Sequence, residues 1–169
     1  MGDAVDLVLE QWKRERPDLD AFPMGVVGRI GRANQLLGRR LREHFAAHNL
    51  QPWEFDILAT LRRSGAPYCL TPGALIETSM VTAGAITNRI DRLVARDLVT
   101  RETDPTNRRS VLITLTDHGR GLVDDAVATH VDNEAGLLEA LTLDEQHHLS
   151  QLLRRLLISL GDGAPTPSP

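Results

Sequence analysis

Residues 70–116 most constrain the fold of this chain, because two helical patterns are followed there directly by two β-prone runs. The first pattern opens with Thr71 as helix N-cap and Pro72 at the first helical position. A brief turn leads to a longer helix over residues 82–96. The β-prone runs LVTRETD and SVLITLT come next, separated by the turn-forming stretch PTNRR. This order predicts a helix-turn-helix unit that carries a β-hairpin wing.

The helix expected over residues 82–96 has two chemically different sides. At about 100° per residue, one side is apolar and predicts a buried stripe formed by Ala83, Ile86, Ile90 and Leu93. The opposite side is small and polar near its start and cationic further on, and is formed by Gly84, Asn88, Asp91, Arg92 and Ala95. Such a face suits the DNA major groove, which admits a helix and presents base edges to polar side chains.

Apolar residues recur at helical spacing on both sides of this unit. Helices are expected over residues 3–15, about 23–48 and 52–64, and helix resumes at Asp117. The last helix has a capping-box pattern, Thr142 with Glu145, ahead of Leu149, Leu152, Leu153, Leu156, Leu157 and Leu160. The expected fold class is therefore mainly α with a small β-hairpin wing. A helix this rich in leucine, in a chain of 169 residues, predicts packing against a second subunit.

Charge is unevenly distributed along the chain, although its net value is −4. From Arg89 to Arg109 there are six arginines and four acids, whereas from Asp117 onward there are nine acids and three arginines. Because electrostatic recognition depends on local potential more than on total charge, a basic surface can meet DNA while the acidic part faces solvent. No apolar run reaches the roughly 18 residues of a membrane span, and the N-terminal stretch lacks a signal-peptide pattern. We expect a cytoplasmic protein with no membrane partner.

The stretch from TPGALIETS to LITLTDHG, followed by two long helices, resembles the MarR family of winged helix-turn-helix transcription regulators over about residues 24–160. The most typical residues are those of the wing and the helix start after it: Asp104, Arg108, Arg109, Val111, Leu115, Thr116 and Gly119. Asn107 stands where many members have Asp, a change that keeps the turn chemistry. The N-terminal tryptophan and the segment EFDILATLRRSG resemble the urate-responsive branch of the family.

This resemblance implies one domain over residues 1–160, with dimerisation helices in 1–50 and 117–160 and a DNA-binding lobe in 52–116. The Pro/Gly/Ser-rich tail, residues 161–169, is expected to be disordered. The implied partners are a second copy of the chain, a double-stranded DNA operator with an inverted repeat, and a small anionic effector. The effector would be urate or another purine, or a polycarboxylate such as aconitate or citrate. Its binding would release a repressor from DNA, and no cofactor is implied.

Two groups of residues are the expected DNA contacts. On the recognition helix these are Thr82, Thr87, Asn88 and Arg92, because Asn can bond an adenine edge and Arg can bridge a guanine or hold phosphate. Arg108 and Arg109 lie in the expected wing, which is thin enough to approach the negative potential of a narrow minor groove. An adjacent arginine pair in a turn is ordinarily a solvated surface feature, and its position after a helix-turn-helix favours the DNA role.

The residues that the resemblance implies in effector response are Trp12, Asp56, Arg89 and Arg101. Trp12 offers a stacking face, the two arginines can bind an anion, and Asp56 can repel it or share a proton with it. From periodicity alone Asp56 could equally face solvent, and Trp12 could equally pack in a dimer core. Arg89 falls at the edge of the buried stripe of its helix, so it can point away from DNA.

The sequence contains few candidates for a metal, redox or catalytic site. His44 and His48 have the spacing of two metal ligands on one helix, but no third ligand is evident, so solvated helix histidines and no metal site are expected. Cys69, the one cysteine, reads as a small buried or half-buried side chain, with a redox thiol as the alternative. The sequence shows no phosphate-binding glycine loop and no nucleophile motif, so an enzyme is not expected. The alternative function is a winged-helix interaction module or antirepressor that does not bind DNA.

Overall fold

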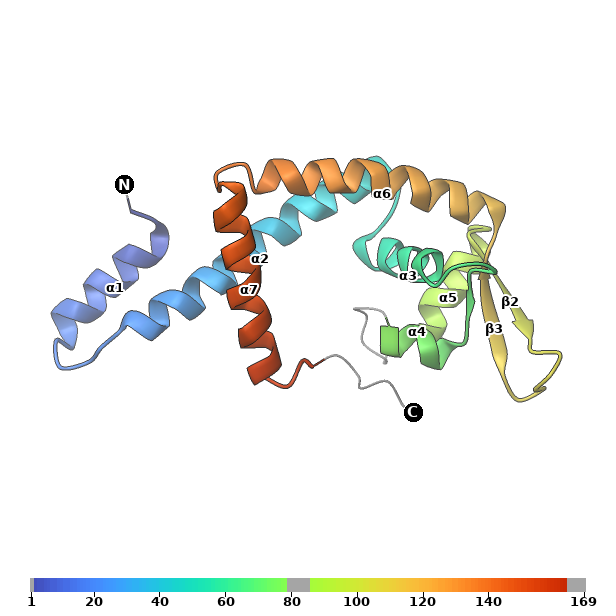
Figure 1. Ribbon diagram of the computed structural model, residues 1–169, viewed down its shortest axis with the longest axis horizontal. Helices are drawn as coiled ribbons and strands as arrows, with labels where there is room; N and C mark the ends of the chain where they lie inside the picture. The colour runs from blue at the N-terminus through green and yellow to red at the C-terminus, as the bar shows by residue number, and fades with distance from the viewer. Residues whose placement is uncertain (1, 79–85, 164–169) are drawn as a thin grey trace. The chain divides into compact units, whose positions relative to one another are not determined.

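The structure is a computed structural model that describes residues 2–78 and 86–163. Within those ranges the elements are α1 (Ala4–Glu15), α2 (Phe22–Ala47), α3 (Pro52–Arg63), β1 (Cys69–Leu70), α4 (Pro72–Thr78), α5 (Ile86–Ala95), β2 (Val99–Thr103), β3 (Val111–Leu115), α6 (Asp117–Leu137) and α7 (Leu143–Ser159). The chain forms two compact units, Met1–Ala128 and Thr129–Pro169. The predicted fold class, mainly α with a small β wing, is confirmed (Figure 1).

The N-terminal helix α1 packs against α2 and is capped by an acid. The Asp3 carboxylate accepts hydrogen bonds from the backbone N–H groups of Val5 at 2.8 Å and Asp6 at 3.0 Å. Arg29 of α2 donates to Asp3 at 2.7 Å and also pairs with Asp6. The Asp3 pKa is held below its ordinary value, chiefly by this Arg29 hydrogen bond. Val5 is buried in the contact, whereas Trp12 on the same helix remains 39% exposed.

The core of the first unit lies among α3, α4, α5 and the sheet. It buries Phe45, Leu50, Ile57, Leu58, Leu61, Leu75, Ile86, Ile90, Leu93, Leu98, Val99, Ile113, Leu115, Val123 and Ala126. The apolar side predicted for α5 is confirmed by its three buried residues in this set, and Ala83 lies outside the described residues. Burial of one side of α5 leaves its opposite side available to a partner.

A buried carboxylate joins the start of α3 to the residue that follows α5. Glu54 is 2% exposed, and its Oε2 accepts from the backbone N–H of Gln51 at 2.7 Å and pairs with Arg96 Nη1 at 2.9 Å. Arg96 also donates to the carbonyl of Asn49 at 2.8 Å. Breaking a buried ion pair typically costs about 3 kcal/mol or more, since it leaves an uncompensated charge. The end of α5 is therefore anchored to the first turn of α3.

The sheet has three strands, in the order β1-β3-β2, with both pairs antiparallel. The predicted hairpin is present as β2 and β3, with Arg101 opposite Ile113. The sequence prediction was incomplete because it lacked β1, whose Cys69 and Leu70 pair with Thr114 and Ile113. Two residues are too few to show the alternation by which strands are recognised in sequence. Cys69 is half-buried in this strand, which agrees with its interpretation as a small packed side chain.

Three hydrogen bonds and one close approach join the residues between α5 and β2 to the start of α6. The Thr116 hydroxyl donates to the carbonyl of Asp97 at 2.7 Å and accepts from the N–H of Gly119 at 2.9 Å. The Thr116 N–H donates to the carbonyl of Leu98 at 3.2 Å. Gly119 approaches the same carbonyl so closely that a Cβ built on it would lie 2.0 Å from the oxygen. Glycine is required there because any side chain would collide with backbone.

In the second unit, α7 begins at the predicted capping box. The Glu145 carboxylate accepts from the backbone N–H of Thr142 at 2.8 Å, and the Thr142 hydroxyl accepts in return from the N–H of Glu145. In one chain the α7 leucines remain 37–74% exposed: Leu149, Leu152, Leu153, Leu156, Leu157 and Leu160. An apolar face of this size is typical of a surface that binds a partner. Among the residues described, no helix is long and apolar enough to cross a membrane.

Candidate nucleic-acid interface

The outward side of α5 presents the polar residues predicted for it. Asn88 and Arg92 are exposed and lie opposite the buried Ile90 and Leu93, and Thr87 is exposed at the border of the buried side. Thr82, the fourth residue expected on this surface, lies outside the described residues. A hydroxyl, an amide and a guanidinium on the exposed surface of one helix offer the donors and acceptors that base edges and phosphates use.

The turn between β2 and β3 is organised by one acid. The Asp104 Oδ1 accepts from both the hydroxyl and the N–H of Thr106 at 2.7 Å and from the N–H of Asn107 at 3.3 Å. These hydrogen bonds, that of the Thr106 hydroxyl first, hold the pKa of the Asp104 carboxyl below its ordinary value. The Asn107 side chain accepts a hydrogen bond from the N–H of Arg109 at 3.2 Å. Asn107 thus stabilises the turn by a bond to backbone two residues ahead.

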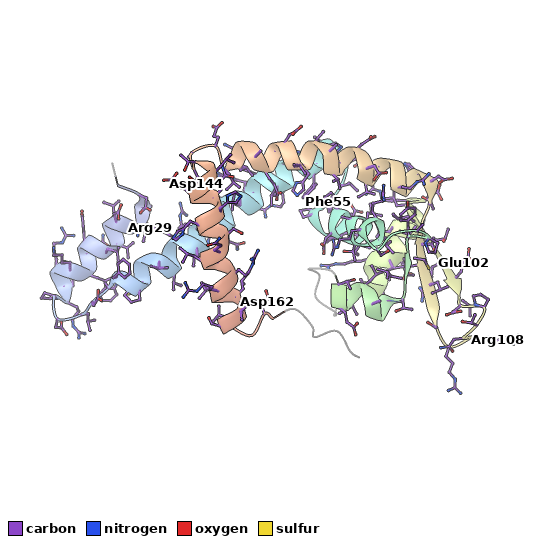
Figure 2. The ribbon with its side chains drawn as sticks, in the orientation of Figure 1. Arg29, Phe55, Glu102, Arg108, Asp144 and Asp162 are labelled. Carbon is purple, nitrogen blue, oxygen red and sulfur yellow. The ribbon has the colours of Figure 1, made fainter. Side chains whose placement is uncertain are left out.

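The two wing arginines follow directly in this turn. Arg108 and Arg109 are exposed, and Figure 2 shows the Arg108 side chain extending away from the tip of the hairpin. No carboxylate in the described ranges forms an ion pair with either guanidinium within 4.0 Å. Both cations are therefore available to an external anion, as a wing that enters a groove requires.

Trp53, in the first turn of α3, contacts two arginines of α5, an arrangement that the sequence prediction missed. The guanidinium carbon of Arg92 lies 5.0 Å from the centroid of the Trp53 ring, and that of Arg89 lies 5.5 Å from it. Both distances are within the range of a cation–π interaction. The two arginines are three positions apart and so share a helix face, which is the only signal of the pair in the sequence. Nothing local links them to a tryptophan on an earlier helix.

Arg89 is half-buried, as expected from its place at the edge of the apolar stripe. Its Nη1 is buried and lacks a hydrogen-bond partner among the residues that the structure describes. Arg101 of β2 pairs instead with Asp91 of α5 at 2.9 Å, in an ion pair whose members are both exposed. One predicted effector arginine therefore has a buried N–H group without an acceptor among the described residues, and the other holds a carboxylate that an anion could replace.

The remaining two predicted effector residues lie on other helices. Asp56 is half-buried on α3, and its backbone carbonyl accepts from the Thr60 hydroxyl at 2.7 Å. Trp12 lies on α1, which packs against α2. Asp56, Arg89 and Arg101 thus come from α3, α5 and β2 of the winged unit, while Trp12 comes from the N-terminal helix pair.

His44 and His48 have the spacing of two metal ligands on one helix. The rings of His44 and His48 on α2 lie 5.3 Å apart. Within the described part of the chain, no group of three or more His, Cys, Asp or Glu side chains could hold a metal ion.

Comparisons with known proteins agree with this geometry. A model of the MarR family matches residues 48–110. The HTH-type transcriptional regulator PecS from Dickeya dadantii (strain 3937) is 42% identical over 90% of this chain and 92% of its own length. A mutant MarR from E. coli complexed with operator DNA has a TM-score of 0.70 at 29% identity, covering 86% of this chain and 97% of that one. BpsR from Bordetella bronchiseptica, whose DNA binding is regulated by 6-hydroxynicotinic acid, has a TM-score of 0.60 at 28% identity, covering 73% and 91%.

Proposed function

Because this chain belongs to the MarR family of DNA-binding transcription regulators, we propose that it is a homodimeric repressor released from a palindromic operator by a small anionic effector. Its membership makes it a transcription regulator and not an enzyme. The proposal of DNA binding by a repressor rests chiefly on one observation: α5 has an exposed polar face, and the wing carries two exposed arginines, Arg108 and Arg109, that form no ion pair with any described carboxylate. The operator complex of the E. coli relative supports it. We place this repressor in the cytoplasm, where operator DNA lies.

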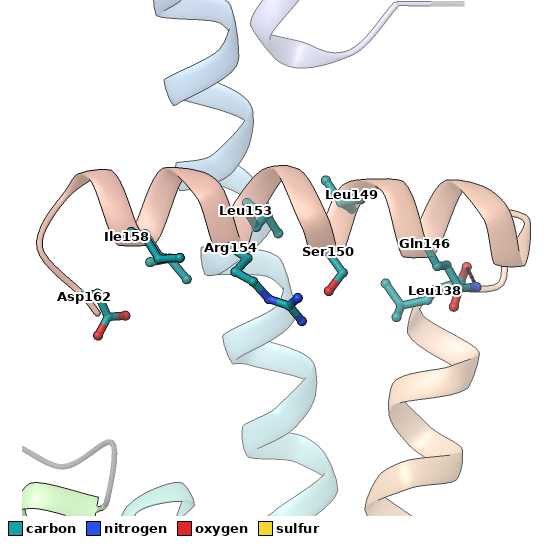
Figure 3. Close-up of a pocket in the computed structure, with 9 residues that line it drawn as sticks. Leu138, Gln146, Leu149, Ser150, Leu153, Arg154, Ile158 and Asp162 are labelled. Carbon is teal, nitrogen blue, oxygen red and sulfur yellow. Dashed lines mark hydrogen bonds between the residues drawn. The ribbon is translucent and has the colours of Figure 1, made fainter. Parts of the chain in front are cut away.

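The apolar face of α7 supports the homodimer. Leu149, Leu153 and Leu157 border a hollow on the second unit together with Leu138 and Ile158 (Figure 3). A face this apolar is unfavourable in water, and a second copy of the same helix offers a complementary surface. In this proposal residues 1–50 and 117–160 supply the dimer contacts, and residues 52–116 form the DNA-binding lobe.

The dimer has a direct test in solution. The protein at micromolar concentration is expected to show twice the mass of one chain by light scattering. Replacing Leu153 and Leu157 with Asp should shift it toward the monomer, because two charges per chain would then be desolvated in the contact. Replacing Gln151 with Asp on the same helix is the matched control and should leave the mass unchanged. A monomeric mass for the unaltered chain would contradict the proposed assembly.

Two-fold symmetry sets the operator geometry. Each α5 would enter a major groove, with Thr82, Thr87, Asn88 and Arg92 as base and phosphate contacts. The two grooves on one DNA face lie about 34 Å apart, so the operator is an inverted repeat. Arg108 and Arg109 of each wing would reach the adjacent minor groove, where narrow A·T-rich stretches concentrate negative potential.

The proposed effector site uses Trp12, Asp56, Arg89 and Arg101. Two of these support an anion as ligand: the buried Nη1 of Arg89 has no acceptor among the described groups, and Arg101 pairs with an exposed carboxylate, that of Asp91. An effector bound to Arg89 would displace α5, which carries the base-reading residues. It must prefer the arrangement that does not bind DNA, since equal affinity for both arrangements shifts neither. Urate or another purine is the first candidate, and aconitate or citrate the next; the 6-hydroxynicotinic acid response of BpsR is a further case of an acidic effector.

Effector release can be separated from DNA affinity. Each candidate compound is titrated into the complex of the protein with DNA from its own promoter. For the active compound, replacing Arg89 or Arg101 with Gln should raise the concentration for half-release by about 10- to 100-fold, the worth of one charge-assisted hydrogen bond. Replacing Trp12 with Leu should raise it less. Arg40→Gln removes the same charge from an exposed position on α2 and is the control. Full release of all these variants at the normal concentration would refute the site.

A further inference from the structure

Trp53 is a half-buried aromatic residue whose ring is shared by two arginines of the recognition helix. We propose that Trp53 is a positioning residue for DNA binding: its ring holds the Arg92 guanidinium in place before DNA arrives. This inference rests on the proposed function, because it takes Arg92 as a DNA contact. Trp53 itself touches no DNA in this proposal and acts through Arg92.

The ring is held on a fixed support. Trp53 packs against the hydrophobic core and lies between Pro52 and Glu54 in the first turn of α3. Glu54 is the buried acid that pairs with Arg96 at 2.9 Å, one turn beyond Arg92 on the same stretch of chain. The tryptophan and the recognition helix are therefore tied to each other beside the place where ring and guanidinium meet. A ring on such a support can fix the position of a flexible side chain.

The contact leaves Arg92 free to bind DNA. Its guanidinium carbon lies 5.0 Å from the ring centroid, and none of the described carboxylates forms an ion pair with it. A cation–π contact uses the π face of the ring and leaves the five N–H donors of Arg without a required acceptor. An ion pair would instead have occupied those donors with a carboxylate that phosphate must displace. The aromatic partner thus orders the side chain without competing for its hydrogen bonds.

Arg89 distinguishes the two arginines. It is half-buried with one unpartnered Nη1 among described groups, whereas Arg92 is exposed. The same ring therefore stabilises one cation that faces inward and one that faces outward. Ordering a long side chain in advance removes an entropy cost that DNA binding would otherwise carry. The expected contribution is about 3- to 10-fold in affinity for each Arg92, and roughly 10- to 100-fold for a dimer with two.

A double-mutant cycle tests this role. Operator affinity is measured for the full-length chain and for Trp53→Leu, Arg92→Ala and the double variant. Trp53→Leu keeps an apolar side chain but removes the π face, and should weaken operator binding by about 10- to 100-fold. In the Arg92→Ala background the same substitution should cost less than about 3-fold, since its target is already gone. Trp53→Phe, which retains a ring, should recover most of the affinity.

A purely structural role predicts different results. The matched control is Phe55→Leu, two residues after Trp53 on α3. It removes a ring that stacks on the Phe45 ring, with the two centroids 4.3 Å apart. Its effect should be equal with and without Arg92, and unfolding curves for every variant identify those that fail to fold. If Trp53→Leu costs as much in the Arg92→Ala background as alone, or if Trp53→Leu binds normally, the positioning role is wrong. If Arg92→Ala alone binds normally, the Arg92 contact in the proposed function is wrong instead.

Discussion

Replacing Gly119 with alanine is expected to lower the free energy of unfolding by about 3 kcal/mol or more, since overpacking against backbone cannot be relieved by a rotamer change. The Cβ would lie 2.0 Å from the Leu98 carbonyl oxygen and 2.9 Å from its carbon. Leu98 is fully buried, and its carbonyl also accepts a hydrogen bond from the Thr116 N–H. The carbonyl therefore cannot move away from the added methyl group. For a chain of this size the loss corresponds to a fall of roughly 10 °C in the melting temperature.

A second glycine of α6 supplies the control. A Cβ on Gly121 would meet nothing within 4 Å, and the position is exposed. Gly121→Ala should therefore raise the free energy of unfolding by up to about 1 kcal/mol, because alanine is the better helix former. Chemical denaturation measures both changes in the free energy of unfolding, which should have opposite signs at these two positions of one helix. Equal stability of Gly119→Ala and the unaltered chain would mean that α6 does not approach Leu98 as described.

Replacing Arg108 and Arg109 together with alanine is expected to weaken operator binding by at least about 10-fold at moderate salt. Each phosphate contact contributes about 0.9 to the slope of log affinity against log salt, so losing four arginines per dimer should flatten that slope by about 2 to 4. The turn itself should persist, because Asp104 organises it through Thr106 and Asn107. Fluorescence anisotropy at several salt concentrations gives both quantities.

Another adjacent arginine pair tests whether charge alone explains the loss. Arg39 and Arg40 are exposed on α2, and replacing both with alanine removes the same charge from outside the wing. Exposed charges more than about 10 Å apart are largely screened at 0.1 M salt, so this variant should keep its salt slope. If the wing variant has unchanged affinity and an unchanged salt slope, Arg108 and Arg109 do not contact DNA and the role proposed for the wing is wrong. Binding to promoter DNA that does not depend on salt at all would favour the interaction-module alternative.

Much of the fold follows from local signals in the sequence. Pro52 begins α3, Thr71 caps α4 by accepting from Ala74 at 3.2 Å, and Thr142 caps α7. Each start was predictable because a cap or a first-turn proline acts on neighbouring backbone groups. The half-burial of Arg89 was equally predictable from its angle on the helix. The roles of Arg89, Arg101, Asp56 and Trp12 in effector binding remain predictions.

The contacts between distant segments did not follow from the sequence. β1 forms only because β3 offers it an edge, and a two-residue strand has no pattern of its own. Trp53 meets Arg92, and Glu54 meets Arg96, only after α3 and α5 pack together. Gly119 was expected from the family resemblance, but its physical reason is a carbonyl on another element. These contacts depend on tertiary packing, which overrides local preference.

The contacts at Thr116 also couple the start of α6 to the residues that precede β2. The Thr116 hydroxyl donates to the Asp97 carbonyl and accepts from the Gly119 N–H, and Gly119 packs directly against the Leu98 carbonyl. These contacts tie the first turn of α6 to the residues that lead into β2, so neither segment can shift alone without breaking a hydrogen bond or colliding with backbone. The position of the wing relative to α6 is therefore fixed by packing at Thr116 and Gly119 as well as by the hairpin itself.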